Sequence, residues 1–279
     1  MPELPEVETV KNTLKRLVLT RTIKSVVVRY DNIIEYPMSD EFIEKIKNQK
    51  INDIHRRGKW LLFELSDFYL LSHLRMEGKY FLKTNHDELD KHEHIIFKLD
   101  NGEELRYRDT RKFGKMWLVD KKEIDECKPI KELGLEPWDK ELTGEYLLDK
   151  YKNKRLPIKS VLLDQSIITG IGNIYADEIL FLSKLNPCQI SSSLSIDDCN
   201  NIIKYTKEVL EKAIELGGTT IRTYESSEGV HGRFQNNLLV HNKKGEKCPN
   251  CDTIIEKIVV GGRGTYYCKV CQKYAYKLS

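Results

Sequence analysis

The chain has 279 residues, of which 40% are hydrophobic and 32% are charged, and its mean hydropathy is -0.51. This composition fits a soluble globular protein of about two domains and excludes disorder, collagen and coiled coil as the main state. The longest apolar stretch, residues 60–72, is interrupted by Glu64 and Asp67 and falls short of the roughly 18 uncharged residues that a membrane span needs. We therefore expect no transmembrane segment.

The charge is unevenly distributed along the chain. The formal net charge is +3, yet residues 235–279 hold eight basic and three acidic residues, so this segment carries +5. A basic tail on a near-neutral body indicates a local contact with a polyanion, although a solvated surface explains the same pattern. The first ten residues carry three glutamates and no basic residue, the opposite of a secretion signal. We therefore expect a cytoplasmic protein.

The first half of the sequence is predicted to be a short helix followed by β-strands. Pro5, acidic residues in the first turn, and Val7, Val10, Leu14 and Leu17 at helical spacing predict a helix with one buried face. From residue 22 to about 119, short β-rich runs are separated by turn signals, at 23–28, 59–63, 69–71, 94–97, 104–107 and 115–119. This spacing is typical of a β-sandwich or barrel, interrupted by one helix at about 40–48.

The second half is predicted to be α-helical. Residues 127–138, with two prolines and a glycine, indicate a linker, and helical periodicity follows around 146–148, 161–163, 174–182 and 202–216. Asn173 is placed to cap the helix that it precedes. Residues 217–234 are rich in Gly, Ser and Thr and indicate a mobile loop.

Four of the seven cysteines form two close pairs near the end of the chain. Cys248 and Cys251 are followed by Cys268 and Cys271, with sixteen residues between the two pairs. Two such pairs place four thiolates tetrahedrally around one zinc ion, which closes the coordination sphere, so the metal is structural. Four buried thiols without metal would leave a tail of about 40 residues with too little core to fold.

Several other motifs suggest contacts with nucleic acid, each beside a simpler explanation. Between the cysteine pairs, a predicted hairpin carries Arg263 among the glycines of its tip, residues 261–264. Backbone and guanidinium can approach a phosphate there, or the tip is simply an exposed polar turn. The turn at 170–173 entering a helix can bind phosphate through its amides, or it is an ordinary helix connection. Arg111 and Phe113 are surface residues, or they replace an extruded base.

The N-terminus carries a possible nucleophile. Removal of the initiator methionine exposes the amine of Pro2, beside Glu3 and Glu6. A terminal amine has a pKa of about 7.8, against about 10.4 for lysine, so far more of it is neutral and nucleophilic near neutral pH. A secondary amine can attack an electrophilic carbon and form an iminium. A proline in the first turn of a helix explains the same residue without chemistry.

Together these motifs strongly resemble the bacterial formamidopyrimidine-DNA glycosylase family. The resemblance runs from Met1 to about Lys273 and rests on six blocks: PELPEVETV, RRGKWLLFEL, HLRMEGKY, DTRKFG, GIGNIYADE and GGRGTYYCKVCQ. It implies an α+β protein with three domains. These are an N-terminal catalytic β-sandwich with the terminal helix (1–130), a helix-two-turns-helix DNA-binding domain (131–236) and a C-terminal zinc-finger β-hairpin (237–279). Trp60 and His241 stand where tyrosine is more usual, and the tail after Gln272 is unusual.

The resemblance also implies a bifunctional glycosylase and apurinic-site lyase of base excision repair. Pro2 would attack C1′ of the damaged nucleotide, expel an oxidised purine and leave a Schiff base that undergoes β- and δ-elimination. Glu3 would donate or shuttle protons and Glu6 would support it. Lys59 would aid β-elimination and contact DNA, and Arg263 would hold a phosphate and assist δ-elimination.

The same resemblance implies the DNA contacts and partners. The partner would be double-stranded DNA with oxidised purines or abasic sites, and the protein would be a monomer with one structural Zn²⁺ and no membrane contact. The loop 217–233 would cover the extruded base. Met76, Arg111 and Phe113 would fill the gap that the extruded nucleotide leaves, and Arg111 would read the cytosine opposite the lesion. The expected DNA-binding residues are Met76, His92, Arg111, Phe113, Lys154 and Asn173.

Three other functions remain open from the sequence. An endonuclease VIII-like relative that excises oxidised pyrimidines shares the proline and the finger, but Leu4 in its PELPEV context and the pair Arg111 and Phe113 favour the purine enzyme. A lesion-binding protein that does not cut DNA would lack Pro2 or Glu3. A zinc-ribbon protein that binds RNA would show an aromatic pattern or a clamp that this chain lacks.

Overall fold

The protein is described by a computed structural model in which residues 1–219 and 233–275 are placed. These residues form two compact units: residues 1–131 with 217–219, and residues 132–216 with 233–275. This division is one of compactness, so the three-domain boundaries stay a prediction. None of the helices in the described ranges combines the length and apolar character that a membrane span requires.

The first unit begins with helix α1 (Leu4–Val18), which places Glu3 at its N-cap. Leu4, Val7 and Leu14 are fully buried, because their spacing puts them on one face of the helix. A second helix, α2 (Ser39–Ile46), buries Phe42 and Ile46 in the same core.

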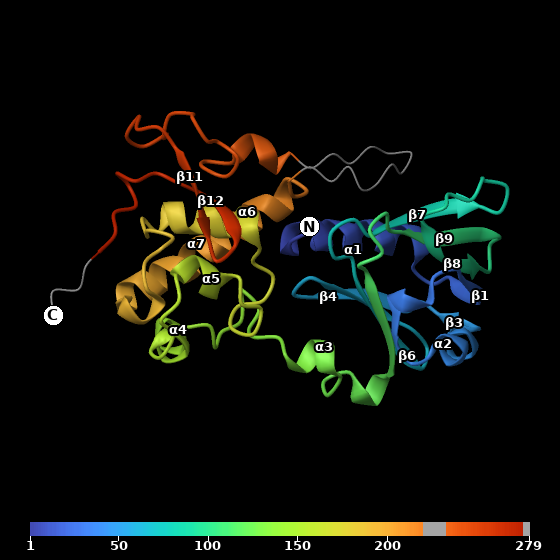
Figure 1. Ribbon diagram of the computed structural model, residues 1–279. Helices are drawn as coiled ribbons and strands as arrows, with labels where there is room; N and C mark the ends of the chain where they lie inside the picture. Colours follow the sequence, from blue (N-terminus) through green and yellow to red (C-terminus); the bar gives the residue numbers. More distant parts are fainter. Residues whose placement is uncertain (220–232, 276–279) are drawn as a thin grey trace. The chain divides into compact units, whose positions relative to one another are not determined.

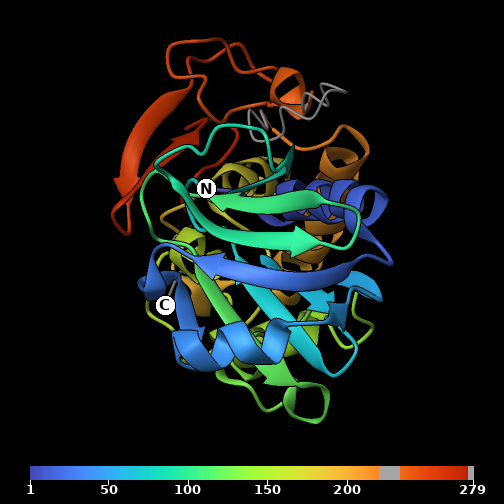
Figure 2. The same ribbon diagram turned by 90° about the vertical axis from the view of Figure 1, so that its right-hand side faces the viewer.

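Two five-stranded sheets form the rest of the first unit (Figures 1 and 2). The first has the order β3 (Gln49–Lys50), β1 (Thr22–Val28), β8 (Glu93–Leu99), β9 (Glu103–Arg108), β7 (Lys79–Thr84). The second has the order β2 (Ile34–Tyr36), β10 (Lys115–Asp120), β6 (Phe68–His73), β5 (Trp60–Glu64), β4 (Asp53–Arg57). Apart from the parallel pair of β2 and β10, the strands pair antiparallel. Both sheets and α1 contribute to one hydrophobic core, so the predicted sandwich with its terminal helix is confirmed.

The second unit is mainly helical. Its helices are α4 (Gly144–Tyr151), α5 (Ile158–Leu162), α6 (Asn173–Leu182) and α7 (Ile196–Glu215). The long helix α7 packs against α4 and α6. Side-chain caps start two of these helices: Thr143 accepts a hydrogen bond from the Tyr146 amide in α4, and Ser195 forms a capping box with Asp198 in α7.

Short helical segments connect these elements. Helix α3 (Lys128–Lys131) lies within the predicted linker 127–138. This part of the linker is helical because the amides of Ile130 and Lys131 donate to the Cys127 carbonyl. Single 3₁₀ turns occur at Asp31–Ile33, Lys121–Glu123, Ser191–Ser193 and Phe234–Asn237. The predicted mobile loop at 217–234 lies mostly outside the described residues.

A two-stranded hairpin, β11 (Glu256–Val260) and β12 (Arg263–Tyr267), lies near the end of the second unit. The structure corrects the predicted four-residue tip. Val260 pairs with Arg263, so the turn consists of Gly261 and Gly262 alone and Arg263 begins β12. Both glycines have positive φ angles, 56° and 74°, as the tightest hairpin turns require.

Candidate active site and zinc centre

The N-terminal residues are organised by the start of α1. Glu3 is 3% exposed, and its backbone amide donates to Glu6 Oε2 at 2.9 Å. The two residues form a capping box, in which each carboxylate faces the backbone amide of the other residue. The helix thereby fixes the backbone directly after Pro2. A carboxyl group and the residue that would be the nucleophile are therefore neighbours on an ordered segment.

Glu6 also connects α1 to Thr219, near the start of the predicted loop 217–233. Its Oε1 accepts hydrogen bonds from the Thr219 amide at 2.8 Å and from the Thr219 hydroxyl at 3.0 Å. The two oxygens of this buried carboxylate therefore join the backbone at Glu3 to the last described residue of the segment. The predicted cover over an extruded base, 217–233, otherwise lies outside the described residues.

Lys59 lies in the tight turn between β4 and β5 and is buried. His73, at the end of β6, pairs with Trp60 in the sheet, and the two rings are 4.8 Å apart. Burial, together with the positive charges of Arg75 and Lys59, lowers the pKa of His73 to about 3. Its Nδ1 accepts a hydrogen bond from the Arg75 amide, so the imidazole is neutral with its proton on Nε2. His73 lies in the HLRMEGKY block but is not among the predicted site residues.

The burial of His73 predicts a pH dependence of stability. Because its pKa of about 3 in the folded state lies below the ordinary 6.5, the unfolded chain takes up this proton first as the pH falls. The stabilisation is complete above about pH 6.5 and is lost towards pH 3, by about 2 kcal/mol at about pH 5. We measure the free energy of unfolding in urea at about pH 7.5 and about pH 5. Between these two values it should fall by about 2 kcal/mol less in His73→Asn than in the parent, because asparagine takes up no proton. Parallel pH profiles for the two proteins would contradict this expectation.

Three expected gap-filling residues lie together on two loops of the first unit. Met76 is on the connection between β6 and β7, and Arg111 and Phe113 are on the connection between β9 and β10. Met76 is 41% exposed and Phe113 is 48% exposed. Arg111 links them, because its Nη1 lies 3.5 Å from Met76 Sδ and its guanidinium carbon lies 4.7 Å from the centre of the Phe113 ring. The structure therefore brings this predicted group together.

His92 lies directly before β8, where the backbone holds it. Its amide donates to Asp90 Oδ1 at 2.7 Å, and its carbonyl accepts from the Asp109 amide at 2.9 Å. The preceding loop is anchored by Arg106, which is buried and donates to the carbonyls of Thr84, Asp87 and Glu88. The imidazole of His92 is half-buried at the surface of the first unit.

In the second unit, Asn173 is hydrogen-bonded to Gly264, the residue that directly follows Arg263. The structure corrects the predicted capping role of Asn173: Gly172 is the N-cap of α6, and Asn173 is the first helical residue. The Asn173 Nδ2 instead donates to the Gly264 carbonyl at 3.1 Å. This bond holds the start of β12, and with it the exposed Arg263, beside the N-terminus of α6.

A buried ion pair that was not predicted from the sequence supports the same strand. Lys159 and Asp177 are both fully buried and 2.6 Å apart, and Lys159 also donates to the Gly264 carbonyl at 3.2 Å. The second oxygen of Asp177 accepts from His241 Nδ1 at 2.7 Å and from the Tyr266 amide at 3.3 Å. Asp177 therefore joins α5, α6 and β12. The charge of Lys159 made it resemble a solvated residue in the sequence.

Replacing Asp177 by asparagine should strongly destabilise the second unit. The change leaves the Lys159 ammonium buried without its counter-charge, which costs about 3 kcal/mol or more. Thermal unfolding should show a midpoint lowered by several degrees. The matched control is Asp149→Asn, which breaks the exposed pair with Lys152 and should leave the midpoint unchanged. Equal midpoints for both variants would contradict the structural role of Asp177.

Lys154 follows α4, and its ammonium lies 3.4 Å from Asp164 Oδ2. Its carbonyl accepts hydrogen bonds from the Ser191 hydroxyl and the Ser192 amide, so the backbone at this position is held against the Ser191–Ser193 turn. Both charged side chains are about one-third exposed. The lysine is therefore half-buried beside one carboxylate.

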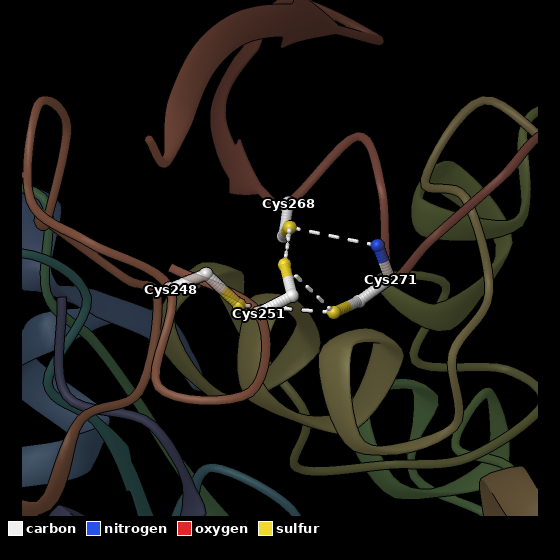
Figure 3. Close-up of side chains that lie close together, drawn as sticks. All are labelled: Cys248, Cys251, Cys268 and Cys271. Carbon is white, nitrogen blue, oxygen red and sulfur yellow. Dashed lines mark hydrogen bonds between the residues drawn. The ribbon is translucent and has the colours of Figure 1, made fainter. Parts of the chain in front are cut away.

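The four predicted ligand cysteines converge at the base of the hairpin (Figure 3). Their sulfur atoms all lie within 4.8 Å of one another. The separations are 3.7 Å for Cys248 and Cys271, and 3.4 Å for Cys251 with both Cys268 and Cys271. Tetrahedral zinc with bonds of about 2.3 Å requires about 3.8 Å between sulfurs, so the residues fit the ion. Four thiolates fill the coordination sphere, and the site is a structural Zn²⁺ site, as predicted.

Comparisons with known proteins agree with this arrangement. Residues 1–116 match the family profile described as the formamidopyrimidine-DNA glycosylase N-terminal domain, and residues 133–225 match its H2TH domain. Residues 245–273 match a zinc finger found in FPG and IleRS. The formamidopyrimidine-DNA glycosylase of Bacillus cereus is 48% identical over 98% of this chain and 99% of its own length. That of Exiguobacterium sibiricum is 48% identical over 99% of this chain and its full length.

Solved structures show the same fold. A complex of the Lactococcus lactis Fpg with DNA containing an abasic site has a TM-score of 0.91 and 39% identity, covering 97% of this chain and 99% of that one. A complex of the same protein with DNA containing N7-benzyl-Fapy-dG has a TM-score of 0.91 and 38% identity, covering 98% and 100%. The matches define a DNA glycosylase of base excision repair with a C-terminal zinc finger. The chain belongs to the formamidopyrimidine-DNA glycosylase family, and the predicted fold, enzyme class and zinc finger are confirmed.

Proposed function

We propose that this protein excises oxidised purines, such as 8-oxoguanine and formamidopyrimidines, from double-stranded DNA and then cleaves the strand at the resulting site. The observation that carries the proposal is the start of α1, where Pro2 directly precedes a buried Glu3 whose amide is bound to Glu6. Base-excision chemistry needs a nucleophile and a proton donor at one carbon atom. The fixed backbone at residue 3 supports such a pairing.

The reaction begins once Met1 is removed and the Pro2 nitrogen is a free secondary amine. This nitrogen forms a bond to C1′, the glycosidic bond breaks, and the base leaves with the bonding electrons and takes up a proton. The Pro2 nitrogen loses its proton, the C1′–O4′ bond breaks with its electrons going to O4′, which takes up a proton, and the open sugar is a Schiff base, a cation that acidifies the C2′ protons. Loss of that proton expels the 3′ phosphate, and a second elimination expels the 5′ phosphate. A carboxylic acid suits these proton transfers, and we assign them to Glu3 with support from Glu6.

Fixed cations are assigned to the phosphates. Arg263 begins β12, whose position is held by the bonds of Gly264 to Asn173 and Lys159. A guanidinium on a rigid strand can hold a phosphate through two hydrogen bonds, which suits a role in δ-elimination. We assign Lys59, in the turn before β5, to β-elimination, and Asn173, His92 and Lys154 to further DNA contacts.

Met76, Arg111 and Phe113 are assigned to the gap that the extruded nucleotide leaves. An exposed thioether and phenyl group can stack between bases, and a guanidinium between them can read the base opposite the lesion. Their mutual contacts support a common role. Phosphate contacts carry no information on sequence or damage, so this group would supply part of the selectivity.

Two rival functions make different predictions. An endonuclease VIII-like enzyme would release oxidised pyrimidines in preference to oxidised purines. A lesion-binding protein would bind the damaged duplex and leave the strand intact. Leu4 and the pair Arg111 and Phe113 favour the purine enzyme, and the presence of both Pro2 and Glu3 favours an enzyme over a binding protein. We also propose a monomer in the bacterial cytoplasm.

The test is a panel of duplexes carrying 8-oxoguanine, a formamidopyrimidine or thymine glycol at one position. We expect base release from the purine lesions, followed by a one-nucleotide gap with phosphate at both ends, the product of β,δ-elimination. Preferred release of thymine glycol would support the pyrimidine enzyme instead. Retarded but uncut duplexes would support the binding protein.

A further inference from the structure

The loop that carries Arg111 and Phe113 is organised around one buried carboxylate. Asp109 is fully buried, and its Oδ1 accepts a hydrogen bond from the Arg111 amide at 2.9 Å. Its Oδ2 accepts from the amides of Phe113 at 3.0 Å and Gly114 at 2.8 Å. Lys112, between them, has a φ angle of 57°, the left-handed conformation that turns these amides towards one acceptor. Asp109 thus fixes the backbone on both sides of Lys112.

A buried phenol group connects this loop to the loop that carries Met76. Tyr107, on β9, is fully buried. A Cβ atom at Gly114 would lie 1.7 Å from the Tyr107 hydroxyl oxygen, and one at Gly78 would lie 2.2 Å from it. Only glycine permits this approach at either position. The two loops therefore close onto the same side-chain oxygen, which fixes their separation.

The separation of the two loops affects the exposed side chains that they carry. Met76 is two residues before Gly78, and Phe113 directly precedes Gly114, so the distance between the loops determines whether Arg111 reaches Met76. That contact joins the two loops over 3.5 Å, so a displacement of one loop by the width of an atom would break it. A group that reads a base edge by hydrogen bonds tolerates little displacement.

We propose that Tyr107 and Asp109 are positioning residues that set the discrimination of the base opposite the lesion. They act through Arg111, because their side chains hold the backbone of the loop that carries it. The inference rests on the proposed function, because it assumes that Arg111 reads the opposite base. To that function it adds Tyr107 and Asp109 as the residues that hold Arg111 in position for reading the base. Their loss should affect substrates that have an opposite base and spare a substrate that has none.

The experiment compares kcat/KM on duplexes with 8-oxoguanine opposite cytosine or adenine, and cleavage of single-stranded DNA with an abasic site. We expect Asp109→Asn to lower the cytosine-to-adenine ratio about tenfold, because the amide group opposes one of the three backbone donors. Tyr107→Phe should lower the ratio about threefold, since it removes only the shared hydroxyl. Cleavage of the single strand should stay within about twofold of the parent for both variants.

The matched control is Tyr80→Phe. Tyr80 is the sheet partner of Tyr107, is equally buried, and its hydroxyl donates to the Ser72 hydroxyl on β6 at 2.7 Å, so the control removes a buried hydroxyl that is bonded to β6. It should keep the parental ratio. If Asp109→Asn does not fold, Tyr107→Phe with this control decides the question. An unchanged ratio in Tyr107→Phe, or an equal fall on all three substrates, overturns the proposal. A parent protein that cleaves none of the substrates overturns the proposed function instead.

Discussion

Replacing Cys268 by alanine is expected to abolish zinc binding and reduce affinity for a lesion-containing duplex by about 100-fold or more. Cys268 is one of six buried residues in the small core between the finger and α6, with Phe181, Val240, Cys248, Ile255 and Tyr266. Two of those six are zinc ligands, so the core is too small to fold the segment without metal. Structural zinc supplies about 10–16 kcal/mol in peptides of this kind. Losing it should release β12 and Arg263 from their fixed position.

The measurement combines metal analysis of the purified variant with a binding titration on the duplex. The matched control is Cys188→Ala, a half-buried cysteine of the same unit outside the metal site. It should keep one zinc per chain and the parental affinity. A Cys268→Ala protein that binds the duplex like the control would show that the finger's fold does not depend on the metal.

Glu3→Gln is expected to lower the rate of base release by about 10²- to 10⁴-fold, the range for loss of a general acid or base. The amide keeps an acceptor for the capping box, so α1 should stay intact. Single-turnover release of 8-oxoguanine measures the chemical step. Binding of the duplex should change by no more than about threefold, since an amide of the same size replaces the carboxyl group and no contact area is lost.

The control for this substitution is Glu8→Gln on the same helix. Glu8 is half-buried and bonds to Arg56 at 2.9 Å, so its replacement removes a carboxylate from α1 without touching the N-terminus. Its rate of base release should match the parent. If Glu3→Gln releases the base as fast as Glu8→Gln, Glu3 is not the proton donor.

Much of the fold could be predicted because apolar periodicity is local information. The strands β1, β5, β6, β8, β9 and β10 coincide with the predicted β-rich runs, and α1 begins where Pro5 and the acidic residues indicate. Strand β4 (Asp53–Arg57) was not predicted, because three of its five residues are charged. Pairing with β5, and the bond of Arg56 to Glu8, place these residues in the sheet.

The zinc centre was predictable because spacing alone defines its ligands. The supports of the other site residues were not, since charged residues resemble solvated ones in a sequence. Lys159 and Arg106 are both buried, and their partners come from elements distant in the chain. Asn173 showed the same limit, because its side chain bonds to Gly264, 91 residues away, and does not cap its own helix.

The most direct test of the proposed chemistry is borohydride trapping on a duplex with 8-oxoguanine opposite cytosine. The Schiff base, once reduced, joins the protein covalently to the DNA, and peptide mass analysis locates the bond. We expect one adduct, on the nitrogen of Pro2 in a chain that has lost Met1, and a lower yield from Pro2→Gly. Tight binding of the lesion by a chain that begins at Pro2, with neither adduct nor strand cleavage, would contradict the account and leave a lesion-binding protein.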